Sequence, residues 1–168
     1  MNARCYDCEM ADVLSWVDCR EPGREARRYM MDRADWDYKR SPFQRDGVVI
    51  LRAGFRLSPG DPQRMEALMR DHRQDREKKG HFLFPCAGSV FKNNRAFGAP
   101  TGMLVDSLGL KGRRIGGAQV APFHGNIIVN TGGASAQDVR DLIELVEGEV
   151  LRRLGFTLER EVVLAGAW

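Results

Sequence analysis

Residues 135–155 read SAQDVRDLIELVEGEVLRRLG and carry the clearest helix signal in the chain. Ser135 with Asp138 three residues later resembles a capping box, in which each side chain bonds a backbone N–H group of the first turn. Gly155 supplies the stop. Between these ends an apolar face recurs at helical spacing. It consists of Val139, Leu142, Ile143, Val146, Val150 and Leu154. The pattern predicts an amphipathic helix over residues 135–155.

Shorter elements are expected on both sides of this helix. Apolar runs punctuated by glycine and proline are typical of strands and short helices in a compact domain. Their order, strand, helix, strand, strand, helix, strand, favours an α+β fold over a doubly wound parallel sheet. The expected elements are strands at residues 87–92, 115–120, 126–130 and 158–164 and a short helix at residues 100–108.

The pattern of residues 48–79 predicts one more strand and one more helix. Residues 48–57 alternate small and large apolar side chains, which indicates a strand in a mostly covered sheet. Residues 58–62, SPGDP, break it, and a helix over residues 62–79 follows, with Asp61 as its cap and Gly80 as its stop. This break is the one plausible linker. We therefore expect domains at residues 1–57 and 58–155 and a closing strand within residues 156–168.

Composition excludes several classes of protein. An apolar fraction of 43% supports a buried core. The 26 basic and 23 acidic residues are interspersed, without the basic stripe of a nucleic-acid binder. Residues 70–79 are read as a solvated helix face, with a basic site for a small phosphorylated ligand as the alternative. No apolar stretch approaches the roughly 20 residues of a membrane helix, and no signal peptide is readable. A cytoplasmic protein without a membrane span is expected.

Four cysteines are present, and Cys5 and Cys8 form a Cys-x-x-Cys pair. Such a pair suggests zinc or redox chemistry. A structural zinc site needs four ligands, and neither Cys19 nor a histidine supplies a second ligand pair at suitable spacing. We therefore expect no metal and ordinary reduced thiols, with redox or zinc chemistry as the alternative.

Two glycine-containing segments could carry chemistry. Residues 88–93 read GSVFKN, in which glycine lets backbone approach a ligand and serine can serve as nucleophile or acid. A serine in a glycine turn is more often structural. Residues 109–117 are glycine-rich but have neither dinucleotide nor phosphate-loop spacing, so close backbone packing is the plainer interpretation.

Taken together, these segments resemble the successive signatures of the UDP-N-acetylenolpyruvoylglucosamine reductase family. The matching residues are 87–93 (AGSVFKN), 109–112 (GLKG), 115–120 (IGGAQV), 130–132 (NTG) and 158–162 (LEREV). Upstream, residues 2–3, 12–14, 43–44 and 55–57 with Tyr6, Tyr38 and Ser41 are similar to the second half of the family's flavin-binding part. The resemblance covers nearly the whole chain.

The resemblance implies the C-terminal part of a flavin-binding α+β lobe followed by a mixed α/β substrate-binding domain. In the family, NADPH reduces FAD, and the reduced flavin passes hydride to the enolpyruvyl double bond of UDP-N-acetylenolpyruvoylglucosamine. The short connection between Phe43 and Phe55 is similar to the subclass without the long tyrosine-bearing loop. We expect a monomer, and we expect the family's first flavin-binding region to lie outside this sequence.

Residue roles follow by position in the matching motifs. Ser89 would be the proton donor, and Glu161 the carboxyl that stabilises or protonates the intermediate. The family's catalytic arginine falls on Lys39, with Arg40 one position later; lysine keeps the charge but lacks the bidentate fork.

Binding roles follow in the same way. UDP-sugar contacts match Arg76, Lys79, Asn93 and His124, and the flavin contacts at the N-terminus match Asn2 and Ala3. The alternative is a fragment that binds the UDP-sugar without catalysing its reduction.

Overall fold

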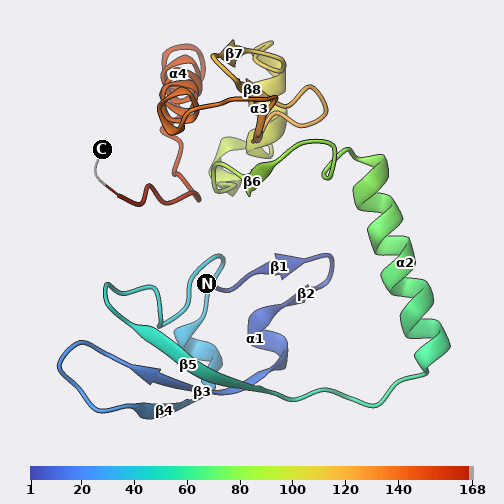
Figure 1. Ribbon diagram of the computed structural model, residues 1–168, viewed down its shortest axis with the longest axis vertical. Coiled ribbons are helices and arrows are strands. Elements are labelled where there is room, and N and C mark those ends of the chain that lie inside the picture. Colours follow the sequence, from blue (N-terminus) through green and yellow to red (C-terminus); the bar gives the residue numbers. More distant parts are fainter. Residues whose placement is uncertain (167–168) are drawn as a thin grey trace. The chain divides into compact units, whose positions relative to one another are not determined.

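The computed structural model describes residues 1–166 and divides into two compact units (Figure 1). Unit 1 covers residues 1–64, and unit 2 covers the chain from residue 65 onward. Every strand pairing in both units is antiparallel. The α+β class expected from the sequence is thereby confirmed.

Unit 1 is a small antiparallel sheet preceded by a hairpin and a single helical turn. The sheet has the order β4-β3-β5, and its core is formed by Ala11, Leu14, Val17, Cys19 and Trp36. The elements are β1 (Arg4–Cys5), β2 (Cys8–Glu9), α1 (Met10–Val13), β3 (Leu14–Arg20), β4 (Arg27–Met30), the 3-10 helix η1 (Arg33–Asp35) and β5 (Val49–Phe55).

The expected strand at residues 48–57 is present as β5, but the expectation that it is covered is wrong. Val49, Ile50 and Leu51 are 55%, 52% and 52% exposed. The physical reason is position, because β5 lies at the edge of a three-stranded sheet. Alternating apolar residues predict a strand, but they do not tell how many layers pack on it.

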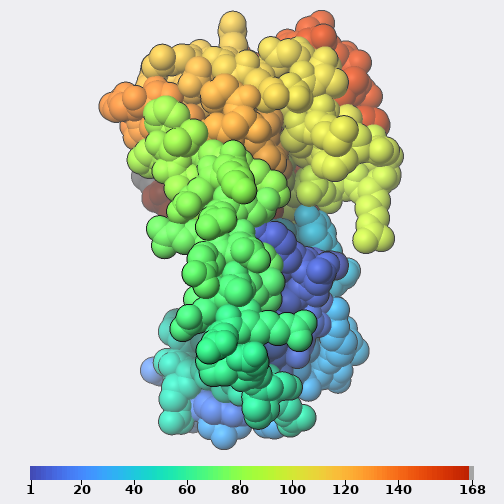
Figure 2. All heavy atoms as spheres, turned by 90° about the vertical axis from the view of Figure 1, so that its right-hand side faces the viewer, coloured from blue at the N-terminus to red at the C-terminus, as the bar shows by residue number. Residues whose placement is uncertain are grey.

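The expected helix at residues 62–79 is confirmed as α2 (Pro62–Lys78). Asp61 Oδ1 accepts a hydrogen bond from the Gln63 N–H at 3.0 Å, and Gly80 has a left-handed φ of 78° just beyond the helix. No residue of α2 is buried, and the side chains of this green helix are visible along its length in Figure 2. Its most exposed apolar side chains are those of Met65, Leu68 and Met69.

Unit 2 is a four-stranded sheet packed against helices. The sheet has the order β6-β9-β8-β7, and α4 packs against β7 and β8. The elements are β6 (Cys86–Ser89), the 3-10 helix η2 (Arg95–Phe97), α3 (Thr101–Ser107), β7 (Arg114–Ile115), β8 (Ala118–Val120), β9 (Ile127–Asn130) and α4 (Ala136–Leu154).

Helix α4 confirms the strongest sequence prediction. The Asp138 N–H donates to Ser135 Oγ at 3.0 Å, and the Ser135 N–H donates to Asp138 Oδ2 at 2.9 Å, which completes the capping box. Gly155 ends the helix with a φ of 74°. The predicted apolar face is buried against the sheet. It contributes Leu142, Ile143, Val146 and Val150, each no more than 1% exposed.

The single strand expected at residues 115–120 is instead a tight hairpin of β7 and β8. Gly116 has a φ of 51°, which reverses the chain. A side chain at Gly117 would clash, because a Cβ there would lie 2.4 Å from Ala134 N and 2.5 Å from Gly132 O. The two glycines are therefore required by the turn and by close backbone packing.

The closing strand expected at residues 158–164 is also wrong. This segment forms one isolated bridge, between Phe91 and Arg160. The Val90 carbonyl accepts from both the Glu161 and Val162 N–H groups, at 2.7 and 3.3 Å, so a regular ladder cannot continue. Residues 167–168, the end of the expected closing segment, lie outside the described residues.

Asn126 holds the segment after β6 in place. Its Oδ1 accepts from the Phe91 N–H at 2.9 Å, and its Nδ2 donates to the Phe91 carbonyl at 2.8 Å. Its own carbonyl accepts from the Val90 N–H at 2.9 Å. Asn126 is only 4% exposed, so these bonds satisfy groups that water cannot reach.

We predict that Asn126→Ala lowers the free energy of unfolding by about 2 to 4 kcal/mol, because it leaves two buried groups of Phe91 unsatisfied. Asn94→Ala is the matched control. Asn94 is exposed and only caps η2 by accepting from the Ala96 N–H, so its loss should cost about 1 kcal/mol. Urea denaturation measures both. Equal losses of unfolding free energy in the two variants would contradict the role of Asn126 in holding Phe91 in place.

Candidate functional site

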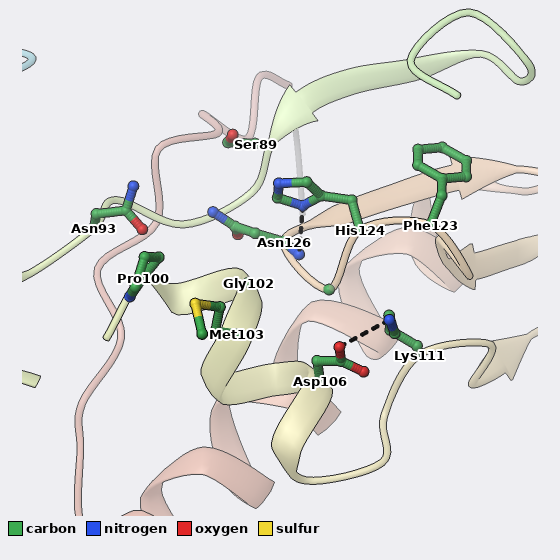
Figure 3. A pocket seen from close by; sticks show the side chains of 11 residues that line it. Ser89, Asn93, Pro100, Gly102, Met103, Asp106, Lys111, Phe123, His124 and Asn126 are labelled. Atoms are coloured by element: carbon green, nitrogen blue, oxygen red, sulfur yellow. Dashed lines mark hydrogen bonds and ion pairs between the residues drawn. The ribbon is translucent and has the colours of Figure 1, made fainter. Parts of the chain in front are cut away.

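A cavity of about 250 Å³ opens in unit 2 where β6, α3 and the loop before β9 meet (Figure 3). Three of the residues predicted for the site lie together around it, namely Ser89, Asn93 and His124. These residues are up to 35 positions apart in the sequence, and the fold brings them to one cavity. The rest of the lining is Pro100, Gly102, Met103, Asp106, Lys111, Phe123, Gly125 and Asn126.

The segment that carries Ser89 and Asn93 is fixed by main-chain geometry. Gly88 has a φ of 81°, a left-handed conformation that sets the direction in which Ser89 enters the cavity rim. Asn93 Oδ1 accepts from the Thr101 N–H at 2.9 Å, and Thr101 Oγ1 donates to the Lys92 carbonyl at 3.0 Å. With its oxygen engaged, Asn93 would meet a ligand through its NH₂ group.

His124 is held in one tautomer. Its Nδ1 accepts from the Asn126 backbone N–H at 3.1 Å, so the neutral ring carries its proton on Nε2 (Figure 3). Burial lowers the pKa of His124 below its ordinary value, and the charge of Lys111 acts in the same direction. The lowered pKa favours the neutral ring, whose Nε2–H can donate a hydrogen bond.

Lys111 and Asp106 are lining residues that the sequence did not single out. Lys111 Nζ lies 2.8 Å from Asp106 Oδ2, and both line the cavity across from Ser89 in Figure 3. Lys111 belongs to the GLKG segment, whose glycines drew attention but whose lysine received no role. The signal that could have found it is a cation in a glycine-rich turn.

Arg76 and Lys79, two further residues predicted to bind the substrate, do not line this cavity. Arg76 lines a second cavity of about 650 Å³ with His81 and the segment Phe82 to Cys86. Lys79 Nζ pairs with Asp75 Oδ2 at 2.8 Å. Burial lowers the pKa of His81, and the charges of Arg76 and Lys79 lower it further.

One histidine of each cavity lies close to the other. The ring of His81 lies 6.1 Å from the ring of His124. The cations Arg76 and Lys79 act on His81 and Lys111 acts on His124. Lys79 is paired with Asp75 and Lys111 with Asp106.

Glu161 reaches the same neighbourhood through its backbone. Its N–H donates to the Val90 carbonyl at 2.7 Å, next to Ser89 in sequence. Glu161 is half-buried but is not among the residues within 1–166 that line the cavity. The structure thus joins Glu161 to the Ser89 segment without making it part of the cavity wall.

The other four predicted site residues belong to unit 1. Lys39 has a φ of 57° in a tight turn in which the Arg40 N–H donates to the Asp37 carbonyl at 3.0 Å. Asn2 is 1% exposed, and its side chain accepts from the Ala11 N–H and donates to the Asp37 carbonyl. The Ala3 carbonyl accepts from the Met10 N–H.

Two further features bear on the class of protein. Among residues 1–166, no three His, Cys, Asp or Glu side chains form a group suited to a metal ion. Within the same described part of the chain, none of the helices has the length and apolar character needed to cross a bilayer.

Sequence relatives share one description. A UDP-N-acetylenolpyruvoylglucosamine reductase of Treponema denticola is 46% identical over 180 residues, which cover 100% of this chain and 56% of the relative. The reductase of Borreliella burgdorferi is 38% identical over 99% of this chain and 55% of its own length. The chain thus spans about half the length of the relatives it matches.

The fold gives the same result. The crystal structure of UDP-N-acetylenolpyruvylglucosamine reductase from Thermus caldophilus matches with a TM-score of 0.76 at 32% identity, covering 96% of this chain and 57% of that one. Residues 78–165 match the family described as UDP-N-acetylenolpyruvoylglucosamine reductase, C-terminal domain. This matched range contains the whole cavity, including Ser89, Asn93 and His124. The chain therefore belongs to the UDP-N-acetylenolpyruvoylglucosamine reductase family.

Proposed function

We propose that unit 2 binds UDP-N-acetylenolpyruvoylglucosamine and protonates it during reduction to UDP-N-acetylmuramate, a step of peptidoglycan precursor synthesis. The observation that carries the proposal is the gathering of Ser89, Asn93 and His124 around one cavity. A proton donor, an amide donor and an imidazole donor then face the same space. The family relationship supports the choice of substrate.

The cations around the cavity suit the diphosphate of the substrate. Lys111 lies in the cavity wall, and Arg76 and Lys79 contribute to the positive charge on the side of His81. A diphosphate would compete with Asp106 for Lys111, and the guanidinium of Arg76 offers a bidentate contact to phosphate oxygens. The NH₂ of Asn93 and the Nε2–H of His124 would add uncharged hydrogen bonds.

The reaction itself needs hydride and a proton. FAD reduced by NADPH would supply the hydride when it is bound. Ser89 would donate the proton to the carbon next to the developing enolate. The residues that follow Ser89 have their backbone bonded on both edges, which fixes the position of the chain there. Glu161 would stabilise the intermediate, and Lys39 or Arg40 would bind the carboxylate where the charge develops.

For the flavin, the residues of unit 1 fit a supporting role. Both polar atoms of the Asn2 side chain are engaged by Ala11 and Asp37. Asn2 would therefore hold the start of α1 against the turn that carries Lys39 and Arg40, instead of contacting the flavin with its amide.

A second candidate function is UDP-sugar binding without reduction. Lys39 favours it, since a lysine at the position of the family's arginine loses the planar fork that grips a carboxylate. The two candidates separate on one assay. Substrate-dependent NADPH oxidation supports the reductase, whereas tight binding of the UDP-sugar without oxidation supports the second candidate.

We predict that Ser89→Ala, in a flavin-loaded enzyme containing this chain, slows reduction of the enolpyruvyl substrate by about 10² to 10⁴-fold, the usual contribution of a positioned general acid. Reduction of the flavin by NADPH should stay within a small factor of its original rate. Stopped-flow absorbance follows the two half-reactions separately. Ser107→Ala, outside the cavity, is the control, and equal losses in both half-reactions would rule out the proton-donor role.

We also predict that affinity for a diphosphate ligand rises as pH falls, because an anion beside His124 raises a pKa that is low in the free protein. Where the pH lies between the pKa of the ring in the free protein and its pKa in the complex, the affinity rises by up to about tenfold for each unit by which the pH falls. UDP-N-acetylglucosamine is a suitable probe, because its diphosphate diester keeps a constant charge near neutral pH.

Calorimetric titration at a series of pH values measures the effect. His124→Gln should flatten the dependence, whereas His72→Gln on α2, away from the cavity, should leave it unchanged. An unaltered slope in His124→Gln would show that His124 does not face the phosphates.

A further inference from the structure

The two cysteines of the Cys-x-x-Cys motif lie opposite each other at the end of the β1–β2 hairpin. Cys5 pairs with Cys8 in the antiparallel register, and Arg4 pairs with Glu9 one step further along. Tyr6 and Asp7 alone make the turn, and Tyr6 takes a left-handed φ of 53°. Both cysteines are exposed thiols in this structure.

This geometry brings the two side chains within bonding reach. Directly opposite residues of an antiparallel pair have Cα atoms about 4.5 to 5.5 Å apart and side chains on the same face. Disulfides form at Cα separations of about 4.4 to 6.8 Å. The backbone therefore already has the separation that a disulfide needs. Cys8 Sγ makes only a weak contact, 3.7 Å from the Glu9 carbonyl, so side-chain rotation costs little.

The hairpin is anchored at both ends, which keeps the pair in register. On the β2 side, Glu9 forms an ion pair with Arg33, and its N–H donates to Asp12 Oδ2 at 2.7 Å. On the β1 side, Asn2 is fixed to the Ala11 N–H at 3.0 Å. The other two cysteines lack this arrangement, since Cys19 is buried in β3 and Cys86 lies in unit 2.

We propose that Cys5 and Cys8 are a reversible dithiol–disulfide site that hydroperoxides oxidise. One cysteine attacks the peroxide as a thiolate and becomes a sulfenic acid, and the other peroxide oxygen departs as water from hydrogen peroxide or as an alcohol from an alkyl hydroperoxide. The second thiol attacks that sulfur, the S–S bond forms, and the sulfenic oxygen leaves as a second water. Two thiols thus lose two electrons and two protons, and the peroxide gains them. A dithiol reductant reverses the change by exchange.

The site does not depend on the proposed reductase activity. It is a property of the hairpin, and it lies in the same unit as Asn2 and Ala3, the predicted flavin contacts. An exposed pair that oxidises reversibly has the character of a redox sensor, the usual role of disulfides in a reducing compartment.

The test treats the full chain with hydrogen peroxide, alkylates the remaining thiols and digests the protein with an endopeptidase that cleaves after acidic residues. Cleavage after Asp7 separates Cys5 from Cys8 unless a disulfide joins them. We expect one joined peptide, lighter by the mass of two hydrogen atoms, that dithiothreitol converts back to two alkylated peptides. A dithiol-selective arsenical should label the reduced protein in parallel.

Cys5→Ser and Cys8→Ser should each abolish the joined peptide and the arsenical label, and Cys86→Ser should leave both unchanged. The substituted positions are exposed, and circular dichroism checks that each variant is folded. Recovery of Cys5 and Cys8 as separately alkylated peptides after oxidation would overturn the proposal. So would a joined peptide that links either residue to Cys86.

Discussion

The paired hydrogen bonds between the Asn126 side chain and the backbone of Phe91 are the constraint on which unit 2 depends. They fix one edge of residues 90–92, while the backbone of residues 159–162 bonds the other edge. The backbone N–H of Asn126 also sets the His124 tautomer. Asn126 thus bonds to Val90 and Phe91, which lie between Ser89 and Asn93 in the chain, and to the ring of His124. Through these bonds it positions the three site residues relative to one another.

The fold was predictable where the determinants are local. For α4, both the capping box of Ser135 and Asp138 and the apolar face lie within one continuous segment. Helices α2 and α3 were predicted correctly for the same reason. The errors concern tertiary context. Residues 158–164 have strand-like composition, but the ladder ends where Val90 accepts two N–H groups. Gly116 reverses the chain within a segment that was expected to be one strand. Strand β5 lies at the edge of its sheet, a position that its alternating side chains do not reveal.

The candidate site was predictable through motif resemblance and not through spacing. Ser89, Asn93 and His124 were named in advance, and the fold brings them to one cavity. The pairing of Lys111 with Asp106 was missed, because residue spacing does not reveal the turn after α3 that brings the two side chains together. The proximity of the His81 and His124 rings was missed, because the two residues are far apart in sequence. The roles of Glu161, Lys39, Arg40, Asn2 and Ala3 stay predictions, since they depend on substrate and flavin.

The most direct test of the account is to map binding of UDP-N-acetylenolpyruvoylglucosamine onto the chain by backbone amide chemical shifts. The account predicts the largest changes at Ser89, Asn93, Lys111 and His124, the residues that share the cavity. Smaller changes are expected at Arg76 and His81, which line the second cavity, because the His81 ring lies close to that of His124. Changes confined to unit 1, with the amides around the cavity unmoved at saturating ligand, would contradict it.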